Sequence, residues 1–271
     1  DTDKPFSGKS MAMIFEKPST RTRMSFDIAA KQLGGSSIIL NPDGIHYGKG
    51  DETLKDTAKV LTEYVDIVML RTSSHKNLEE FGKHLDIPII NGLSDKSHPC
   101  QIMSDILTYE ESNGLITGKT VSWLGDGDNN MSNSLIEAAG KFKFNLKIGC
   151  PKKYAPGKKI LGWAKKNKVN LLITQKPDEA VKNSDCVMTD KWVSMNDKVN
   201  KKTKKKVLKP FQVNKKLMKK ANSNAIFMHC LPVGRGEEVT DEVIDGKQSV
   251  VWRQALNRVH AQKSIIKWCL D

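Results

Sequence analysis

The sequence has few aromatic residues, no long apolar run and no closely spaced pair of cysteines. Only 6% of its 271 residues are aromatic, although 38% are hydrophobic, which is ample for a buried core. No apolar run approaches the roughly 18 residues that a membrane-spanning helix requires, because Lys and Asp interrupt every hydrophobic stretch. The polar segment that begins at Asp1 lacks the charged and then apolar character of a signal peptide. We therefore expect no membrane partner.

The cysteines do not form a metal-binding or disulfide pattern. There are five of them, an odd number, and they lie far apart: Cys100, Cys150, Cys186, Cys230 and Cys269. No pair has CxxC spacing, so neither a zinc ribbon nor a disulfide framework is predicted. We interpret them as reduced thiols of a cytoplasmic protein.

The chain is strongly basic, with 44 Lys and Arg against 31 Asp and Glu. The densest basic run consists of Lys201, Lys202, Lys204, Lys205 and Lys206. This run has no interleaved aromatic side chains that could stack on bases, and Lys is spread along the whole sequence. We therefore interpret the run as a solvated surface segment and expect no nucleic-acid partner. A basic chain also suits a small anionic substrate through long-range attraction.

Short β-branched runs alternate with stretches of helical periodicity along the chain. Strands are predicted at 11–15, 38–40, 65–70, 87–90, 121–124, 146–149, 170–173, 186–189, 225–228 and 249–252. Helices are predicted at about 20–33, 52–64, 76–84, 99–113 and 253–270, with further helices between the later strands. This alternation predicts an α/β fold with two doubly wound parallel sheets and right-handed crossovers.

The polar stretch at 112–120 is the best candidate for a domain boundary. We expect a first domain at 1–113, a second at 114–252, and a C-terminal helix at 253–271 that packs back on the first. The missing initiator Met suggests that residues before Asp1 have been lost.

Ligands of open parallel sheets bind beyond the carboxyl ends of the strands, and polar residues gather there in this sequence. In the first predicted domain they occupy 19–23, Arg71 and 98–101; in the second they occupy 126–130, 190–196 and 229–232.

The segment 19–23 follows a predicted strand and opens a predicted helix. A helix N-terminus offers unpaired N–H groups and a partial positive charge. Ser19, Thr20 and Thr22 add hydroxyl donors, and Arg21 can hold a phosphate through two parallel hydrogen bonds. Although Ser19 could serve only as a cap, three hydroxyls and two arginines within five residues indicate a phosphate site.

The other strand ends are less specific. A bulky cation such as Arg71 has little structural purpose at the end of an apolar strand. His98 and Gln101 share a helix face and could donate to one carbonyl oxygen, although a lone His there is more often a cap. Asp190 could bind an ammonium group or simply cap a turn, and Cys230 could be an inert buried thiol.

Five segments together resemble the carbamoyltransferase family. These are 15–23 (FEKPSTRTR), 98–101 (HPCQ), Asp190 with Ser194-Met195, 229–232 (HCLP) and 257–260 (NRVH), in the order in which the family has them. The resemblance covers essentially the whole chain. It implies carbamoyl transfer from carbamoyl phosphate, and the HCLP and Ser-Met segments favour L-ornithine over aspartate as the acceptor.

The resemblance also implies roles for individual residues. Carbamoyl phosphate would be bound by Ser19, Thr20, Arg21, Thr22, His46, Arg71, His98, Gln101, Cys230, Leu231 and Arg258. Ornithine would be held by Asn130, Asp190, Ser194 and Met195. Arg71, His98, Cys230 and Asp190 would be the catalytic residues. No metal or organic cofactor is implied, and the family forms homotrimers with active sites at the subunit interfaces.

The chain departs from the family pattern at several places. Asn196 follows Met195 where the family usually has Gly, and Leu256 stands where Glu is common. His46 is expected to replace a Gln of the family, and the family has an additional N-terminal stretch. Two alternatives stay open: a sister enzyme that acts on N-acylated ornithine or putrescine, and a non-catalytic ligand-binding homologue.

Overall fold

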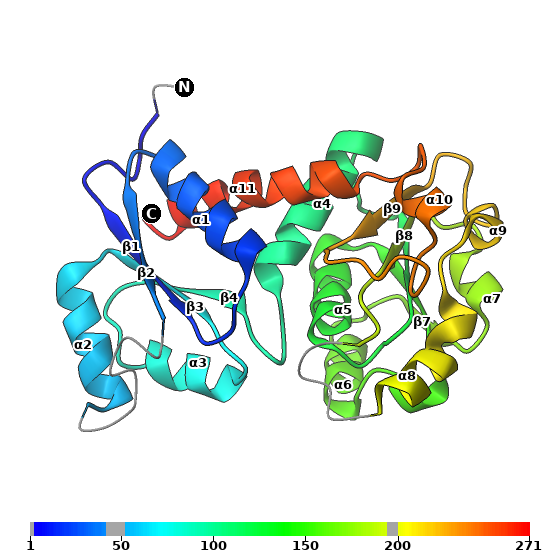
Figure 1. Cartoon of the computed structure of the whole chain (residues 1–271), viewed down its shortest axis with the longest axis horizontal. Helices are drawn as coiled ribbons and strands as arrows, with labels where there is room; N and C mark the ends of the chain where they lie inside the picture. The colour runs from blue at the N-terminus through cyan, green and yellow to red at the C-terminus, as the bar shows by residue number, and fades with distance from the viewer. Residues whose placement is uncertain (1–2, 42–51, 194–199) are drawn as a thin grey trace. The chain divides into compact units, whose positions relative to one another are not determined.

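A computed structural model describes residues 3–41, 52–193 and 200–271 of the chain (Figure 1). His46, Ser194 and Met195 lie outside these described residues. The chain divides into two compact units, Asp1–Ser104 with Leu256–Asp271, and Asp105–Ala255. The limits of the units fall within two helices, α4 (Pro99–Asn113) and α11 (Val251–Trp268), whereas the predicted domain limits are at 113 and 252. No described helix is long and apolar enough to cross a membrane.

Within the described residues, the first unit contains a four-stranded parallel sheet in the order β2-β1-β3-β4 (Figure 1). Its strands are β1 (Ser10–Phe15), β2 (Ser36–Leu40), β3 (Ile67–Arg71) and β4 (Ile89–Leu93). Its helices are α1 (Thr20–Gln32), α2 (Leu54–Tyr64) and α3 (His75–Gly82). The fold therefore places every carboxyl end of this sheet on one edge.

Both faces of β1 are buried, which explains its uninterrupted apolar sequence. Met11, Met13 and Phe15 pack in one apolar cluster with residues of α1 and α11. Ala12 and Ile14 point to the other face and pack with residues of α2 and α3. The alternation shows that helices cover both faces of the sheet, as the α/β prediction requires.

Within the described part of the second unit, a five-stranded parallel sheet has the order β7-β6-β5-β8-β9. Its strands are β5 (Thr120–Leu124), β6 (Asn145–Gly149), β7 (Leu171–Thr174), β8 (Cys186–Thr189) and β9 (Ile226–His229). Its α-helices are α5 (Asn130–Phe142), α6 (Lys158–Lys166), α7 (Pro177–Val181), α8 (Lys201–Leu208), α9 (Lys215–Met218) and α10 (Asp241–Ile244). The predicted fold class is confirmed.

The predicted strand at 249–252 is wrong. Ser249 makes only an isolated bridge to Phe227, and α11 begins at Val251. Val251 and Gln254 are both buried, three residues apart, as on one face of a helix. An apolar run of four residues does not distinguish a strand from the first turn of a buried helix, which is why the prediction failed.

Candidate active site

The strand orders define a topological switch point in each sheet. The chain leaves β1 toward β2 on one side, and β3 then pairs on the other side of β1. In the second sheet the chain runs from β5 through β6 to β7, and β8 then pairs on the opposite side of β5. Ligands of open α/β sheets bind at such switch points, beyond the carboxyl ends of the strands. The residues after β1 and β3, and those after β5 and β8, are therefore the places to look for binding groups.

Two guanidinium groups converge on one buried hydroxyl at the switch point of the first sheet. Ser19 caps α1 by accepting a hydrogen bond from the Thr22 amide at 3.3 Å. The Thr22 hydroxyl, which is fully buried, accepts from Arg258 Nη2 at 2.9 Å and from Arg71 Nη1 at 3.4 Å. Because its oxygen accepts both bonds, its own O–H can donate to a ligand. A helix N-terminus beside two arginines is suited to a phosphate.

Glu16 fixes the backbone that carries Arg71. Its amide donates to the Arg71 carbonyl at 3.0 Å. Its carboxylate accepts the Thr72 hydroxyl at 2.6 Å and the Ser73 amide at 3.2 Å. Glu16 therefore ties the end of β1 to the end of β3. Sequence reasoning included Glu16 only as a letter of the family motif, since the contact joins segments more than fifty residues apart.

His98 and Gln101 lie at the start of α4 and are almost fully buried. Burial, followed by the positive charges of Arg258 and Arg71, lowers the pKa of His98 well below its ordinary value of 6.5. The imidazole is therefore neutral at pH 7 and carries one N–H, which can donate to a carbonyl oxygen without adding a third positive charge. The predicted Thr20 is exposed and Arg21 is half-buried on the same first turn of α1.

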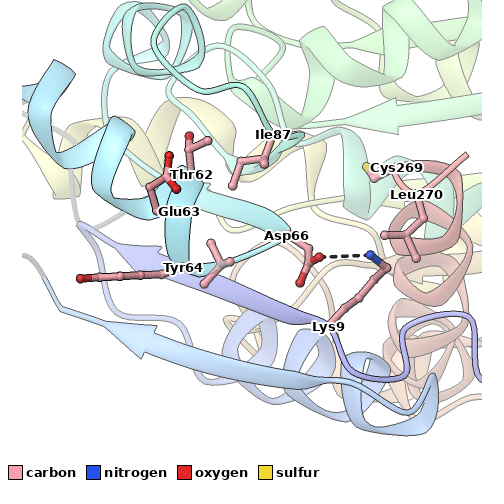
Figure 2. Close-up of a pocket in the computed structure, with 9 residues that line it drawn as sticks. Lys9, Thr62, Glu63, Tyr64, Asp66, Ile87, Cys269 and Leu270 are labelled. Atoms are coloured by element: carbon pink, nitrogen blue, oxygen red, sulfur yellow. Dashed lines mark hydrogen bonds and ion pairs between the residues drawn. The ribbon is translucent and has the colours of Figure 1, made fainter.

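The first unit also has a pocket of about 380 Å³ (Figure 2). Its lining includes Lys9 and Asp66, which form an ion pair at 3.1 Å and directly precede β1 and β3. It is therefore at the amino ends of the strands, opposite the edge where ligands of parallel sheets bind.

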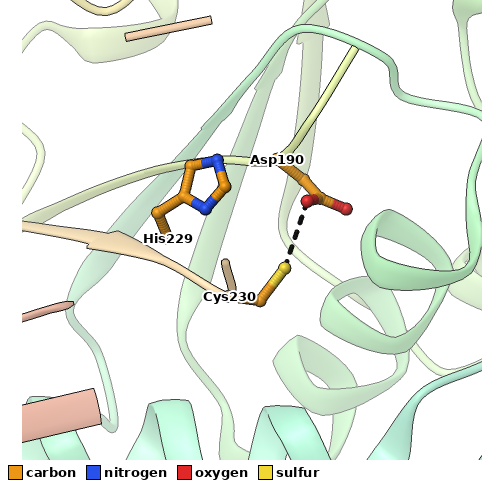
Figure 3. Close-up of side chains that lie close together, drawn as sticks. All are labelled: Asp190, His229 and Cys230. Atoms are coloured by element: carbon orange, nitrogen blue, oxygen red, sulfur yellow. Dashed lines mark hydrogen bonds between the residues drawn. The ribbon is translucent and has the colours of Figure 1, made fainter. Parts of the chain in front are cut away.

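In the second unit, a carboxylate and a thiol meet at adjoining strand ends. Asp190 follows β8 and Cys230 follows β9, and the Cys230 thiol donates to Asp190 Oδ1 at 3.1 Å (Figure 3). The Lys191 amide donates to the same oxygen at 2.7 Å. Both side chains are half-buried. A negative charge and a weakly acidic thiol in contact are suited to binding a positively charged amine.

A fully buried pair orients the turn that carries Cys230. His229 Nδ1 accepts the Leu231 amide at 2.9 Å, so the ring proton is on Nε2, which donates to Glu238 Oε1 at 3.2 Å. Leu231 has a φ of 58°, in the left-handed region, and the hydrogen bond that its N–H donates to His229 Nδ1 helps to hold that conformation. Sequence reasoning missed Glu238 because no local pattern distinguishes it from its neighbour Glu237.

Asp190, His229 and Cys230 form the one group among the described residues whose ligand atoms lie close enough to hold a metal ion, within 4.8 Å of one another (Figure 3). Both ring nitrogens of His229 are already engaged, one by the Leu231 amide and the other by Glu238. The ring therefore has no lone pair to offer, and the set does not fit a metal in this conformation.

Asn130 begins α5, which follows β5 through the turn 125–129. The preceding residue, Asn129, forms a capping box with Ser132: each side chain accepts the backbone amide of the other, at 2.9 Å and 3.2 Å. This places the half-buried Asn130 on the first turn of α5, at the switch point between β5 and β8.

Comparison with known protein families identifies the chain as a carbamoyltransferase. The chain matches the aspartate/ornithine carbamoyltransferase carbamoyl-P binding domain over residues 1–111 and the Asp/Orn binding domain over residues 117–269. It belongs to the aspartate/ornithine carbamoyltransferase family.

Individual relatives show which members of this family the chain is similar to. The chain is 52% identical to the ornithine carbamoyltransferase of Nitrobacter winogradskyi, over 99% of this chain and 86% of the relative. It is 53% identical to that of Rhodopseudomonas palustris, over 100% of this chain and 86% of the relative. Among solved structures, the ornithine carbamoyltransferase from Pyrococcus furiosus is similar with a TM-score of 0.91, at 44% identity over 97% of this chain and 85% of that chain. The anabolic ornithine carbamoyltransferase from Campylobacter jejuni has a TM-score of 0.93, at 36% identity over 99% of this chain and 90% of that chain.

Proposed function

We propose that this protein transfers the carbamoyl group of carbamoyl phosphate to the side-chain amine of L-ornithine, giving L-citrulline and phosphate. The observation that carries the choice of acceptor is the contact between Cys230 and Asp190 at 3.1 Å. A carboxylate at this position attracts the ammonium group of ornithine and repels the carboxylates of aspartate. The high identity to relatives named ornithine carbamoyltransferase supports the same choice.

Carbamoyl phosphate is assigned to the switch point of the first sheet. The first turn of α1 would bind the phosphate through its amides and through Ser19, Thr20, Arg21 and Thr22. The carbonyl oxygen would receive hydrogen bonds from the Arg71 guanidinium, the Thr22 hydroxyl and the neutral His98 ring. Gln101, Arg258, His46, Cys230 and Leu231 complete the proposed set. The convergence of Arg71 and Arg258 on Thr22 supports this assignment.

Ornithine is assigned to Asn130, Asp190, Ser194 and Met195. The side-chain amine must lose a proton before it attacks, and Asp190 and Cys230 would position it and influence that proton. Attack by the neutral amine forms a C–N bond at the carbonyl carbon, places negative charge on its oxygen, and leaves on the nitrogen one proton that the departing phosphate takes. Donors prearranged at such an oxygen are worth roughly 3–4 kcal/mol each. The C–O bond to phosphate then breaks, and phosphate leaves with the electron pair, stabilised by the α1 N-terminus.

A homotrimer is part of the proposal, as are a cytoplasmic location and a role in arginine metabolism. Exposed apolar side chains on neighbouring elements of the first unit support self-association: Met24 and Ile28 on α1, and Ile38 and Ile39 on the edge strand β2. Apolar side chains gathered on an exposed sheet edge are typical of a surface that a partner covers.

Steady-state turnover with four acceptors tests the proposed function. The acceptors are L-ornithine, N-acetylornithine, putrescine and aspartate, each at saturating carbamoyl phosphate. We expect turnover with ornithine and little with the others, and a large loss of turnover in Cys230→Ala. Turnover only with N-acetylornithine or putrescine would keep the chemistry and reject the assignment of Asp190. A folded protein that binds carbamoyl phosphate without turning over any acceptor would be a ligand-binding homologue.

A further inference from the structure

One lysine of the basic run is buried, contrary to the interpretation of that run as a solvated segment. Lys204, on α8, forms an ion pair with Asp126 at 2.6 Å, and the two side chains are only 6% and 8% exposed. Lys201, Lys202 and Lys206 on the same helix are exposed. Because Lys204 is one helical turn before the buried Leu208, helical periodicity could have placed it on the inner face.

Asp126 occupies the turn that leads from β5 to Asn130. Its carboxylate holds Lys204 through Oδ2 and accepts the Asp128 amide through Oδ1 at 3.0 Å. Its carbonyl accepts the Asn129 side-chain amide at 3.1 Å and the Trp123 indole at 2.8 Å. Asp126 thus connects α8 to the backbone of the turn and to the capping residue of α5.

Lys204 lies in an enclosed setting that fixes its ammonium group. The group is 5.3 Å from the centre of the Tyr154 ring, within range of a cation–π contact. Tyr154 packs on an apolar cluster formed by Trp192, Val193 and Leu208. Trp192 and Val193 follow Asp190 directly in sequence, so the cluster joins α8 to the segment that leaves β8.

A buried ion pair seldom adds net stability to a fold, since well-packed apolar residues of similar volume often give equal or greater stability. What an ion pair adds is a fixed geometry between two elements. Here the two elements are α8 and the turn before α5, and the turn ends at a residue assigned to ornithine.

We propose that the Lys204–Asp126 pair is a positioning device for the acceptor amine: it ties α8 to the turn 126–129 and so fixes Asn130. The pair touches neither substrate in this proposal and acts through Asn130. The effect on the acceptor rests on the proposed function, whereas the tether itself does not.

The test uses three variants of the whole chain. Lys204→Met removes the ammonium group, and Lys204→Met with Asp126→Asn removes both charges, so that no buried carboxylate is left without its partner. Lys206→Met is the matched control, since it makes the same change at an exposed position of the same helix. Each variant is measured for KM of both substrates, for thermal unfolding, and for amide hydrogen exchange of residues 127–132.

Both Lys204 variants are expected to raise the KM of the acceptor by about tenfold. This factor corresponds to the lower end of the range of free energies that hydrogen bonds to charged groups contribute. The KM for carbamoyl phosphate should stay within about twofold, because none of the first-unit residues assigned to that substrate touches the pair. Amide hydrogen exchange at residues 127–132 should be faster in both Lys204 variants than in the wild type. Lys206→Met should match the wild type in KM and in exchange.

The double variant decides between positioning and mere stabilisation. The proposal is supported if the double variant unfolds at the wild-type temperature and still has the raised KM for the acceptor. If Lys204→Met fails to fold, the double variant is measured in its place. A double variant with wild-type acceptor KM, or with wild-type exchange at 127–132, overturns it. If the wild type uses an amine other than ornithine, the proposed function fails, and the same comparison with that amine still tests the tether.

Discussion

In the proposed function, the carbamoyl-phosphate half of the site depends on Thr22. Its hydroxyl accepts from Arg258 and Arg71 and keeps its own proton for a ligand. We predict that Thr22→Val, which keeps the shape but loses the hydroxyl, lowers kcat by about 100-fold, the usual cost of one oxyanion donor. Ser25→Ala, on the next turn of α1, is the control and should retain activity. Wild-type kcat in Thr22→Val would remove Thr22 from the site.

His98 gives a prediction for pH. Its pKa is held well below 6.5 in the folded protein by burial and by Arg258 and Arg71, whereas the unfolded chain binds a proton near 6.5. Between these two values the unfolded state binds more protons, so the free energy of unfolding falls as pH falls, by at most about 1.4 kcal/mol per pH unit. Urea unfolding from pH 7 to 5 should show a shallower dependence in His98→Gln. Equal slopes in the two proteins would contradict the low pKa.

At the scale of single elements, β6 shows how closely the second sheet is packed. A methyl group at Gly149 would lie 2.8 Å from both Ala180 Cβ and Leu124 Cδ1. We predict that Gly149→Ala lowers the free energy of unfolding by about 1–3 kcal/mol through overpacking. Gly162→Ala, on α6 with nothing within 4 Å, should instead raise it by about 0.5–1 kcal/mol. Urea denaturation of both variants tests the pair, and equal effects would contradict the packing.

The elements themselves were largely predictable, because strands buried on both faces are short apolar runs and the helices between them are amphipathic. The predicted 186–189 coincides with β8, and 11–15 differs from β1 by one residue. The failures have a common cause. The run 249–252 and the burial of Lys204 both depend on which face of a helix the rest of the chain covers. An apolar run of four residues is too short to show that face, and for Lys204 the local signal is the apolar Leu208 one helical turn later.

Self-association belongs to the scale of the whole molecule. We predict that light scattering after gel filtration gives three times the mass of the chain. Ile39→Lys should shift the mass toward the monomer, because Ile39 pairs with Met13, on the face of the sheet that α1 covers, and the variant places a charge beside the exposed apolar side chains of α1. Leu172→Lys is the control, since Leu172 is 39% exposed on β7, an edge strand of the other sheet. A monomeric wild type would contradict the trimer proposal.

The candidate site was predictable only as a set of sequence motifs. The motifs place Arg71 and Arg258 nearly two hundred residues apart, and only the fold shows that both donate to Thr22. Glu16, Glu238 and Asp126 support the site through contacts between distant segments, and each is a common residue with no local signature. Strand ends indicate where a ligand binds, but the side chains that hold the site in place follow from tertiary packing.

Carbamoyl transfer to the side-chain nitrogen of ornithine is tested most directly by 13C NMR of the product. The wild-type protein is mixed with carbon-13-labelled carbamoyl phosphate and with ornithine that carries nitrogen-15 only on its side chain, beside a sample without protein. We predict a carbonyl signal split by one-bond coupling to nitrogen-15, formed together with one phosphate per citrulline and absent without protein. An unsplit signal, or phosphate release without any new carbonyl signal, would contradict the proposed function.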